Sequence, residues 1–394
     1  MKKSNLNVYL IAETKFTNQE EFPEFKTPAE KFNYFGGLNA GICYMPGTYE
    51  DLRQKPLETT LKRAEGTKAG GHHSVFEHAY VSLYLENIPK LFAMLLNNEK
   101  TYVTSEKSAR YTKMQMQENE EQIYNKWCNI FENEIKSKYP CEQYLDERRI
   151  KKLAQENARY FLSVYTPTNM EYTVSFRQLN YLYFWLKQNQ QKGNCLTAEI
   201  QNEIDDFCAA LEDLKLIDEK LANDQKSRWF SLFTNNKGEK YFGSKTYSTF
   251  YNGSFAQLAQ AQRHRTINYE MIYQNNDKFY VPKLIGNNES LVGEWLSDMQ
   301  KVKSNIPQGK LLTITETGTP QDLILKAKER NCTCAQLEID QQTRQTIKEY
   351  AENCRDLDTK ELMQQHQGSR CTFPDYTCPS PCHFPAGVKG EREI

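Results

Sequence analysis

The 394-residue sequence lacks any apolar run that approaches the roughly 20 residues of a membrane span. It also lacks an excess of one charge, because 50 Lys and Arg residues face 51 Asp and Glu residues and the net charge is −1. This balance leaves no global electrostatic footprint for nucleic acid or for an anionic membrane. We therefore expect no nucleic-acid partner and no membrane partner, and any anion site must be a local cluster.

The N-terminus lacks an export signal, because the apolar stretch in "MKKSNLNVYLIAETKF" is too short for a signal peptide. We therefore expect a cytoplasmic protein in a reducing compartment. The 11 cysteines are then predicted to be free thiols or metal ligands and not disulfides. Hydrophobic residues at 39% and aromatic residues at 12% supply ample core material for a globular chain.

The order of the predicted segments indicates an α/β fold (α+β-like) with a mixed sheet and long helices. Strands are expected over 7–14 and 79–86, and helices over 90–98, 117–160, 172–188 and 197–217. Residues 82–101 and 247–266 share one order of strand, Asn, turn, helix, polar triplet and Thr, at an offset of 165 residues. This weak repetition predicts a first repeat (1–220), a second, shorter repeat (221–354) and a Cys- and Pro-rich tail (355–394).

The stretch "AQAQRHRTINYEMIY" (259–273) places Arg263, His264 and Arg265, the R-H-R triplet, at the predicted end of a helix. Ser254 is expected to be the N-cap of this helix, with Gln257 completing a capping box. Neighbouring helical residues point about 100° apart, so the triplet can surround one large anion only from a helix end. The alternative is that these basic residues are exposed at the C-terminal end of the helix and interact favourably with the helix dipole.

Two stretches of the first repeat carry polar groups. In "GHHSVFEH" (71–78) the order of residues is not H-E-x-x-H, so satisfied polar groups at a strand entrance are favoured over a metal site. In "TSEKSARY" (104–111), Glu106, Ser108 and Arg110 alternate, and an extended segment would put them on one face. A carboxylate, a hydroxyl and a guanidinium on one edge suit a nucleotide, and an exposed polar strand is the alternative.

Taken in order, these motifs resemble the flavin-dependent thymidylate synthases. That family carries an H-x-[ST]-x-x-E-H segment, a helix that ends in R-H-R, and later A-R, T-V-N-x-R-x-L and R-x5-Q-x-E-I segments. The matching stretches here are "HHSVFEH" (72–78), the R-H-R triplet, "NARYFL" (157–162), "YTVSFRQL" (172–179) and "RNCTCAQLEI" (330–339). The resemblance implies two diverged copies of the family's fold in one chain.

The departures from the family pattern are complementary. The first repeat has "NEK" at 98–100 in place of R-H-R but keeps Ser108 and Arg110. The second repeat keeps the triplet and Arg330 but has Tyr273 in place of the Ser. Because the family builds its active site from several subunits, the resemblance implies one site to which both repeats contribute. The motif copies that this site does not use have then decayed. We expect a homodimer that acts as a pseudo-tetramer of repeats, and the sequence leaves open whether a site crosses chains.

The implied activity is reductive methylation of dUMP to dTMP, with FAD as cofactor and with NADPH and methylenetetrahydrofolate as co-substrates. The implied dUMP ligands are Glu106, Ser108, Arg110, Arg159, Gln260 and Arg330, of which Arg110 and Arg330 are also the catalytic candidates. The implied FAD ligands are His72, Ser74, Ser175, Arg263, His264 and Arg265.

Two alternatives stay open. The first is a one-carbon transfer on another pyrimidine nucleotide. Two departures from the family pattern leave it open: Ser175 replaces the asparagine of T-V-N, and Cys43 occupies a position where family members often have Ser. The second is a non-catalytic nucleotide- or flavin-binding homologue, because half of the motifs are degraded. Random decay would damage both copies of some motif, whereas the main motifs survive once each, which favours catalysis.

The tail carries Cys371, Cys378 and Cys382, with His383 beside the last. Prolines make turns there and aliphatic residues are scarce, so a zinc ion is a candidate substitute for a core. The spacing is not the C-x2-C of a zinc ribbon, and the alternative is a tail that is disordered or draped over the surface.

Overall fold

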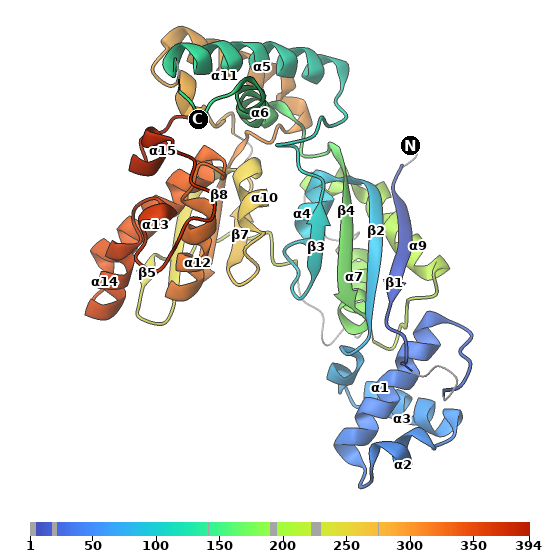
Figure 1. The fold of residues 1–394 in the computed structure, drawn as a ribbon. Helices are drawn as coiled ribbons and strands as arrows, with labels where there is room; N and C mark the ends of the chain where they lie inside the picture. The colour runs from blue at the N-terminus through green and yellow to red at the C-terminus, as the bar shows by residue number, and fades with distance from the viewer. Residues whose placement is uncertain (1–4, 18–21, 141, 190–194, 222–229, 275) are drawn as a thin grey trace. The chain divides into compact units, whose positions relative to one another are not determined.

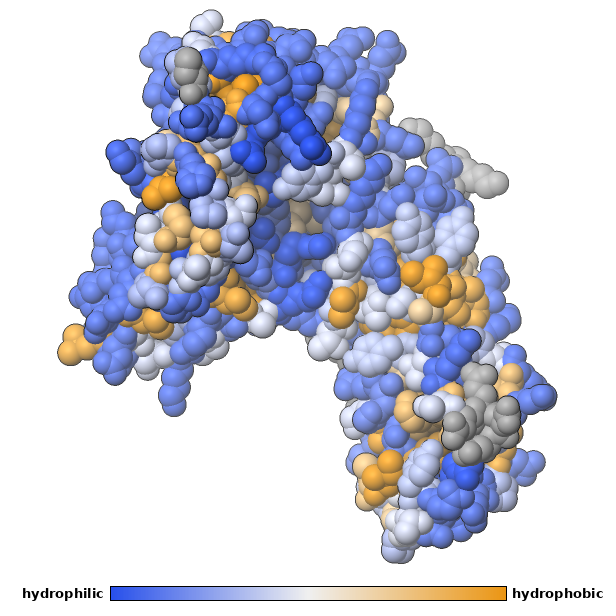
Figure 2. Space-filling view, viewed as in Figure 1, coloured by the Kyte–Doolittle hydropathy of each residue, from blue (hydrophilic) through white to orange (hydrophobic). Residues whose placement is uncertain are grey.

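The computed structural model describes all residues except 1–4, 18–21, 141, 190–194, 222–229 and 275, and the chain forms two compact units (Figure 1). The first unit contains Met1–Lys107 and Pro167–Phe230, and the second contains Ser108–Thr166 and Ser231–Ile394. Across the described ranges, no helix combines the length and the apolar character that a membrane crossing needs. The face drawn in Figure 2 is largely hydrophilic, with scattered apolar patches.

The first unit is built on an antiparallel sheet in the order β1-β2-β4-β3. Its strands are β1 (Asn7–Glu13), β2 (Tyr80–Pro89), β3 (Val103–Glu106) and β4 (Pro167–Ser175). Every second residue of β2 is buried from Val81 to Leu85, because alternate side chains of a strand face one side of the sheet. The helices are α1 (Pro28–Tyr44), α2 (Tyr49–Arg53), α3 (Leu57–Ala69), η2 (His73–Phe76), α4 (Lys90–Leu96), α7 (Phe176–Asn189), α8 (Cys195–Ala198) and α9 (Gln201–Asp213).

The second unit is built on an antiparallel sheet in the order β5-β6-β8-β7. Its strands are β5 (Tyr241–Phe242), β6 (Tyr247–Ser254), β7 (Asn268–Ile272) and β8 (Leu311–Gly318). The helices are α5 (Glu118–Lys138), α6 (Glu147–Ala158), η3 (Arg159–Phe161), α10 (Phe255–Ala261), η5 (Lys283–Ile285), α11 (Glu289–Val302), η6 (Lys303–Asn305), α12 (Pro320–Arg330), α13 (Leu337–Asn353), α14 (Leu357–Gln365), η7 (Arg370–Thr372) and α15 (Pro385–Lys389).

Both sheets follow one topology, in which the last strand in sequence pairs between the second and the third. A seven-residue helix follows the second strand in each unit, and α10 starts at Phe255, 165 residues after α4 starts at Lys90. The expected α/β fold class is confirmed, although both sheets are antiparallel and not mixed. The reason is that the second and third strands of each sheet do not pair with each other: the fourth strand lies between them and runs antiparallel to both.

The expected helix over 172–188 is wrong in its first part, where the chain continues β4. Val174 pairs with Val81 of β2, and Thr173 pairs with both β2 and β3. β-branched residues suit a central strand, and this pairing outweighs the helical pattern that begins at Phe176. The Ser175 hydroxyl accepts a hydrogen bond from the Gln178 amide at 3.2 Å, which marks the point where the strand gives way to α7.

The N-cap of α10 is confirmed, since the Ser254 hydroxyl accepts from the Gln257 amide at 3.1 Å. The expected capping box is only half formed. The Ser254 amide donates to Glu338 at 2.8 Å instead of to Gln257. The buried Glu338 carboxylate also accepts a hydrogen bond from the Ser254 hydroxyl at 2.6 Å. A residue distant in sequence has therefore replaced the local partner.

The main core of the second unit lies among α5, α6 and α11, around Trp127 and Trp295. Their ring centroids are 4.9 Å apart in an edge-to-face arrangement, and the Trp127 indole donates to Asp298 at 2.9 Å. The tail packs into the same core, where Phe384 stacks on Tyr144 at 4.9 Å. The tail is thus an ordered part of this unit, and apolar side chains anchor it.

Candidate functional site

Ser108 and Arg110 lie in a turn that begins the second unit. The last bond to β4 comes from the Lys107 amide, and the Ser108 carbonyl then accepts from Tyr111 and Thr112, both at 3.1 Å. The expectation that Glu106, Ser108 and Arg110 share one extended face is therefore wrong, because turn bonds replace the strand pairing after β3. Glu106 stays in the first unit, where it pairs with Lys90 at 2.6 Å.

The Arg110 guanidinium is held at two points within the second unit. Its Nε donates to Glu156 of α6 at 2.7 Å, and its Nη2 donates to the Cys334 carbonyl at 2.7 Å. Burial works to lower the pKa of Arg110, but the Glu156 carboxylate raises it, and the net direction is upward. Arg110 is thus a fixed cation next to the loop that follows Arg330.

Arg159 is buried at the end of α6 and links three parts of the second unit. Its guanidinium donates to Gln308 at 3.1 Å and to Gln336 at 3.5 Å. The Gln260 amide of α10 also donates to Gln336. Arg159 and Gln260, two of the six residues that the resemblance implies for dUMP, therefore both contact Gln336.

Arg330, the last residue of α12, contacts the R-H-R triplet. Its Nε donates to the Nε2 of His264 at 2.7 Å, and its Nη2 donates to the Gln260 carbonyl at 3.4 Å. Because Nε2 accepts, the ring proton of a neutral His264 must sit on Nδ1. Burial, together with the charges of Arg330 and Lys326, lowers the pKa of His264 to about 2. The imidazole is neutral, so its 3.9 Å separation from Glu329 is no ion pair.

Positive charge gathers in this region without matching negative charge. We name Arg110, Arg159, Arg263 and Arg330 the arginine cluster. Burial lowers the pKa of Arg330, and the positive charges of Arg110 and Arg263 lower it further. Among the described carboxylates near the cluster, Glu156 is committed to Arg110, Glu329 has a side chain that is 56% exposed, and Glu338 is buried near Arg159, where burial raises its pKa. An anion placed here would relieve the repulsion among the guanidinium groups.

Two buried amide atoms beside the cluster point to a ligand. Gln260 Oε1 and Gln336 Nε2 are shielded from solvent and have no hydrogen-bond partner among the residues that the structure describes. A buried polar group without a partner costs about 1–3 kcal/mol, and a ligand that hydrogen bonds to these two atoms would recover that cost. One atom is an acceptor and the other a donor, and together they suit a polar ligand edge that carries both types of group.

The R-H-R triplet does not lie in the helix, because α10 ends at Ala261 and the triplet occupies the turn before β7. Arg263 is exposed, Arg265 is half-buried and His264 is buried. Two guanidinium groups reachable from solvent fit a diphosphate, whereas the neutral His264 supports Arg330. These two arginines are the part of the predicted flavin set that fits FAD best.

The remaining predicted FAD residues lie in the first unit. His72 and Ser74 are exposed beside η2, with the His72 ring 5.9 Å from that of Tyr44. Ser175 is buried, and its hydroxyl caps α7, so it fits a flavin contact poorly. The neighbouring His73 is buried between the Tyr181 hydroxyl at 2.9 Å and the Lys68 carbonyl at 3.1 Å, as expected for a satisfied polar group.

The predicted metal ligands do not form a metal site. Within the described residues, no group of three or more His, Cys, Asp or Glu side chains is placed to hold a metal ion. This result corrects the zinc expectation for Cys371, Cys378, Cys382 and His383. The physical reason is that Phe373 and Phe384 anchor the tail in apolar cores, so no metal is needed in place of a core. The ten described cysteines are all free thiols, as predicted.

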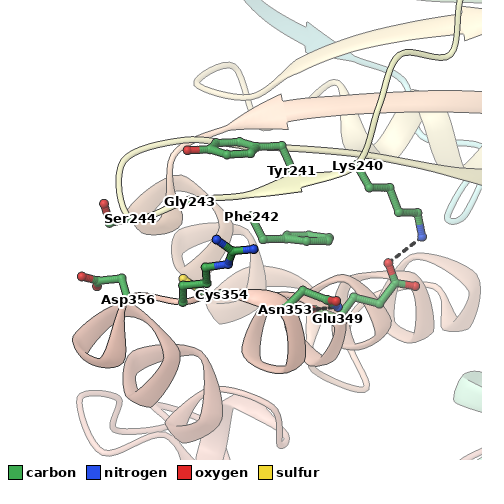
Figure 3. A pocket seen from close by; sticks show the side chains of 10 residues that line it. Lys240, Tyr241, Phe242, Gly243, Ser244, Glu349, Asn353, Cys354 and Asp356 are labelled. Atoms are coloured by element: carbon green, nitrogen blue, oxygen red, sulfur yellow. Dashed lines mark hydrogen bonds and ion pairs between the residues drawn. The ribbon is translucent and has the colours of Figure 1, made fainter.

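The second unit also has a pocket of about 740 Å³ (Figure 3). It is lined by Lys240–Ser244, by Glu349 and by residues 353–356, and it contains none of the predicted site residues. Three of its charged groups are engaged, since Lys240 pairs with Glu349 at 2.7 Å and Asp356 caps α14. We therefore place the candidate site at the arginine cluster and not in this pocket.

Sequence reasoning missed Glu156 and Gln308. Glu156 lies three residues before Arg159 on a predicted helix, so helical spacing placed both on one face and was an available signal. Gln308 lies in the loop before β8 and reaches Arg159 only through the tertiary fold, which no local pattern announces.

Lowering the pH should destabilise the native protein through His264. The unfolded imidazole titrates near pH 6.5, whereas the folded one stays neutral down to about pH 2, so only the unfolded state takes up a proton in between. Stability is therefore lost as the pH falls below 6.5, by about 1.4 kcal/mol between pH 7.5 and 5.5. Urea unfolding of wild type and of His264→Gln, which keeps an acceptor for Arg330, measures this difference. Equal pH dependence in the two proteins would contradict a neutral His264.

Residues 38–211 match the family model described as Thymidylate synthase complementing protein. This match confirms the resemblance to the flavin-dependent thymidylate synthases, and it ends before β5. No curated protein sequence matches the chain.

Several solved structures resemble the chain, including the following two. Thymidylate Synthase X (ThyX) from Helicobacter pylori with FAD and dUMP is 13% identical over 55% of this chain and 100% of its own, with a TM-score of 0.32. The UMP/dUMP methylase PolB from Streptomyces cacaoi bound with 5-Br dUMP is 16% identical over 46% of this chain and 78% of its own, with a TM-score of 0.29.

Proposed function

We propose, from the match of residues 38–211 to the family model of the thymidylate synthase complementing protein, that this protein methylates dUMP to dTMP as a flavin-dependent thymidylate synthase. The observation that carries the proposal is the arginine cluster. Arg110, Arg159 and Arg330, three residues that the resemblance implies for dUMP, lie in one unit and are linked through Gln260, Gln336 and the Cys334 carbonyl.

The arginine cluster and the two glutamines beside it would contact both the phosphate and the base of dUMP. Guanidinium groups bind phosphate strongly because they present several N–H donors in one plane. Gln260 Oε1 and Gln336 Nε2 would accept from and donate to the imide edge of uracil, which carries one N–H between two carbonyls. A positive charge beside the base would stabilise the negative charge that develops on uracil during methylation. Arg110 and Arg330 are the residues that we propose for this electrostatic effect.

The cofactor assignments rest on the family and on the accessible arginines. When bound, FAD supplies the hydride, and the chain supplies binding and orientation. Arg263 and Arg265 would hold its diphosphate, and His264 would keep Arg330 in place through its 2.7 Å hydrogen bond. We propose NADPH as the reductant and methylenetetrahydrofolate as the carbon donor.

We also propose that the chain contains two diverged copies of one fold, the predicted repeats, and that both repeats contribute residues to a single site within the second unit. The equal strand order of the two sheets supports the duplication. The bond from Arg110 to the Cys334 carbonyl supports a site within one chain, because Arg110 comes from the predicted first repeat and Cys334 from the second. A dimer of such chains would hold two sites.

The direct test is dTMP formation. Protein with FAD, NADPH and methylenetetrahydrofolate should convert dUMP to dTMP and release tritium from ring-labelled dUMP, and denatured protein should release FAD. A parallel reaction with UMP separates thymidylate synthesis from methylation of another pyrimidine nucleotide. If a preparation that binds FAD forms no dTMP and releases no tritium, the proposed reaction is contradicted.

A further inference from the structure

Two cysteines follow Arg330 in a short loop that the proposed function does not use. The dithiol loop, Asn331–Gln336, has the sequence "NCTCAQ" and brings Cys332 and Cys334 together. The Cys334 amide donates to the Cys332 sulfur at 3.5 Å, and the two side chains also hydrogen bond. The loop therefore curls so that one thiol lies against the other.

The surroundings of the loop make Cys332 a nucleophile. The hydrogen bond from the Cys334 side chain, helped by the Cys334 amide and by the charge of Arg370 and opposed by burial, lowers the pKa of Cys332 to about 5. The same pairing raises the pKa of Cys334. A thiolate is the reactive form of cysteine, and Cys334 is exposed while Cys332 is half-buried. A small reagent can therefore reach a thiolate with a second thiol beside it.

The dithiol loop is hydrogen bonded to two residues of the arginine cluster and, on its other side, to Arg392. Arg110 donates to the Cys334 carbonyl at 2.7 Å, and the Cys332 amide donates to the Arg330 carbonyl at 2.7 Å. From the other side, the buried Arg392 donates to the carbonyls of Cys332 at 3.1 Å and Ala335 at 2.8 Å. A change of backbone at these two cysteines would therefore move the carbonyl that holds the Arg110 guanidinium and the main chain next to Arg330.

We propose that Cys332 and Cys334 form a thiol-modification site that an oxidised low-molecular-weight disulfide such as glutathione disulfide converts to an intramolecular disulfide, and that this disulfide weakens nucleotide binding at the arginine cluster. The Cys332 thiolate attacks one sulfur of the reagent, forms a mixed disulfide and releases one thiolate. Cys334 then loses its proton and attacks the Cys332 sulfur, which releases the second reagent thiol. Two cysteine thiols are oxidised and one reagent disulfide is reduced to two thiols.

The first readout is chemical and does not depend on the proposed reaction. Trypsin cleavage after Arg330 and Arg344 yields a peptide of residues 331–344, whose two cysteines are Cys332 and Cys334. After treatment with glutathione disulfide and alkylation, we expect this peptide without alkyl groups and lighter by two hydrogen atoms. Cys334→Ser should instead retain one glutathione on Cys332, and Cys371→Ser should behave as wild type. Full alkylation of the peptide in wild type, or no adduct in Cys334→Ser, would overturn the modification site.

The second readout couples the site to the nucleotide and rests on the proposed function. Coupling between two sites commonly changes affinity about 5- to 150-fold, so the Kd for dUMP should rise at least roughly fivefold on oxidation and recover with dithiothreitol. Cys332→Ser should show no change on oxidation. An oxidised peptide with an unchanged Kd for dUMP would overturn the coupling. Absence of dUMP binding by the reduced protein would contradict the proposed function, while the peptide masses would still decide the disulfide.

Discussion

Replacing Arg330 by alanine is expected to weaken dUMP binding by roughly 10- to 150-fold, because a hydrogen bond to a charged group contributes about 1.5–3 kcal/mol. Arg330 combines a half-buried setting, a fixed orientation from His264 and the repulsion of Arg110 and Arg263. The variant removes a cation that has few carboxylates around it. We therefore expect the free energy of unfolding to change less than the free energy of dUMP binding. Isothermal titration with dUMP measures the loss.

The matched control for this substitution is Lys328→Ala. Lys328 is a cation on the same helix, two residues away, and it pairs with Asp375 at 2.5 Å outside the cluster. We expect its loss to leave dUMP affinity within about twofold, as for an exposed ion pair. Equal losses in Arg330→Ala and Lys328→Ala would mean that general positive charge, and not the cluster, attracts the nucleotide.

Replacing Arg110 by alanine is expected to abolish detectable turnover and also to destabilise the second unit by about 3 kcal/mol. The second effect arises because Glu156, whose side chain is 9% exposed, would lose its ion pair and stay behind as an uncompensated charge. Chemical unfolding and dTMP formation, measured on the same preparation, separate the two effects.

A double variant distinguishes structure from binding. Arg110→Ala combined with Glu156→Gln removes the stranded charge, so most of the lost stability should return. Nucleotide binding should not return, because the guanidinium that faces the Cys334 carbonyl is still absent. Recovery of dUMP affinity in the double variant would show that Arg110 acts only through the fold.

Local patterns predicted the parts of this molecule that depend on neighbours in sequence. The strand at β1, the run from β2 into α4, and the N-cap Ser254 follow from alternation and capping chemistry within a few residues. The offset of 165 residues between two segments of one polarity pattern likewise anticipated the starts of α4 and α10.

Features that depend on distant partners were not predictable. The residues after Glu106 alternate as in a strand, yet β3 stops there because the Ser108 carbonyl binds two amides of the following turn. Thr173 and Val174 continue β4 because strands lie on both sides of them. The neutral state of His264 depends on its burial and on Arg330 and Lys326, none of which the triplet itself reveals.

The tail shows how composition can mislead. Its cysteines and prolines suggested a metal in place of a core, yet the few aromatic residues there suffice to anchor it. Phe373 and Phe384 pack into two hydrophobic cores of the second unit. A segment that is anchored in this way needs no hydrophobic core of its own.

The number of dUMP molecules bound per chain tests the central claim most directly. If Arg110 of the predicted first repeat and Arg330 of the second build one site together, equilibrium dialysis with labelled dUMP should saturate at one molecule per chain, and Arg330→Ala should remove that binding. Two molecules per chain would mean that each predicted repeat carries a complete site, and none would mean that the arginine cluster does not bind this nucleotide; either result would contradict the account.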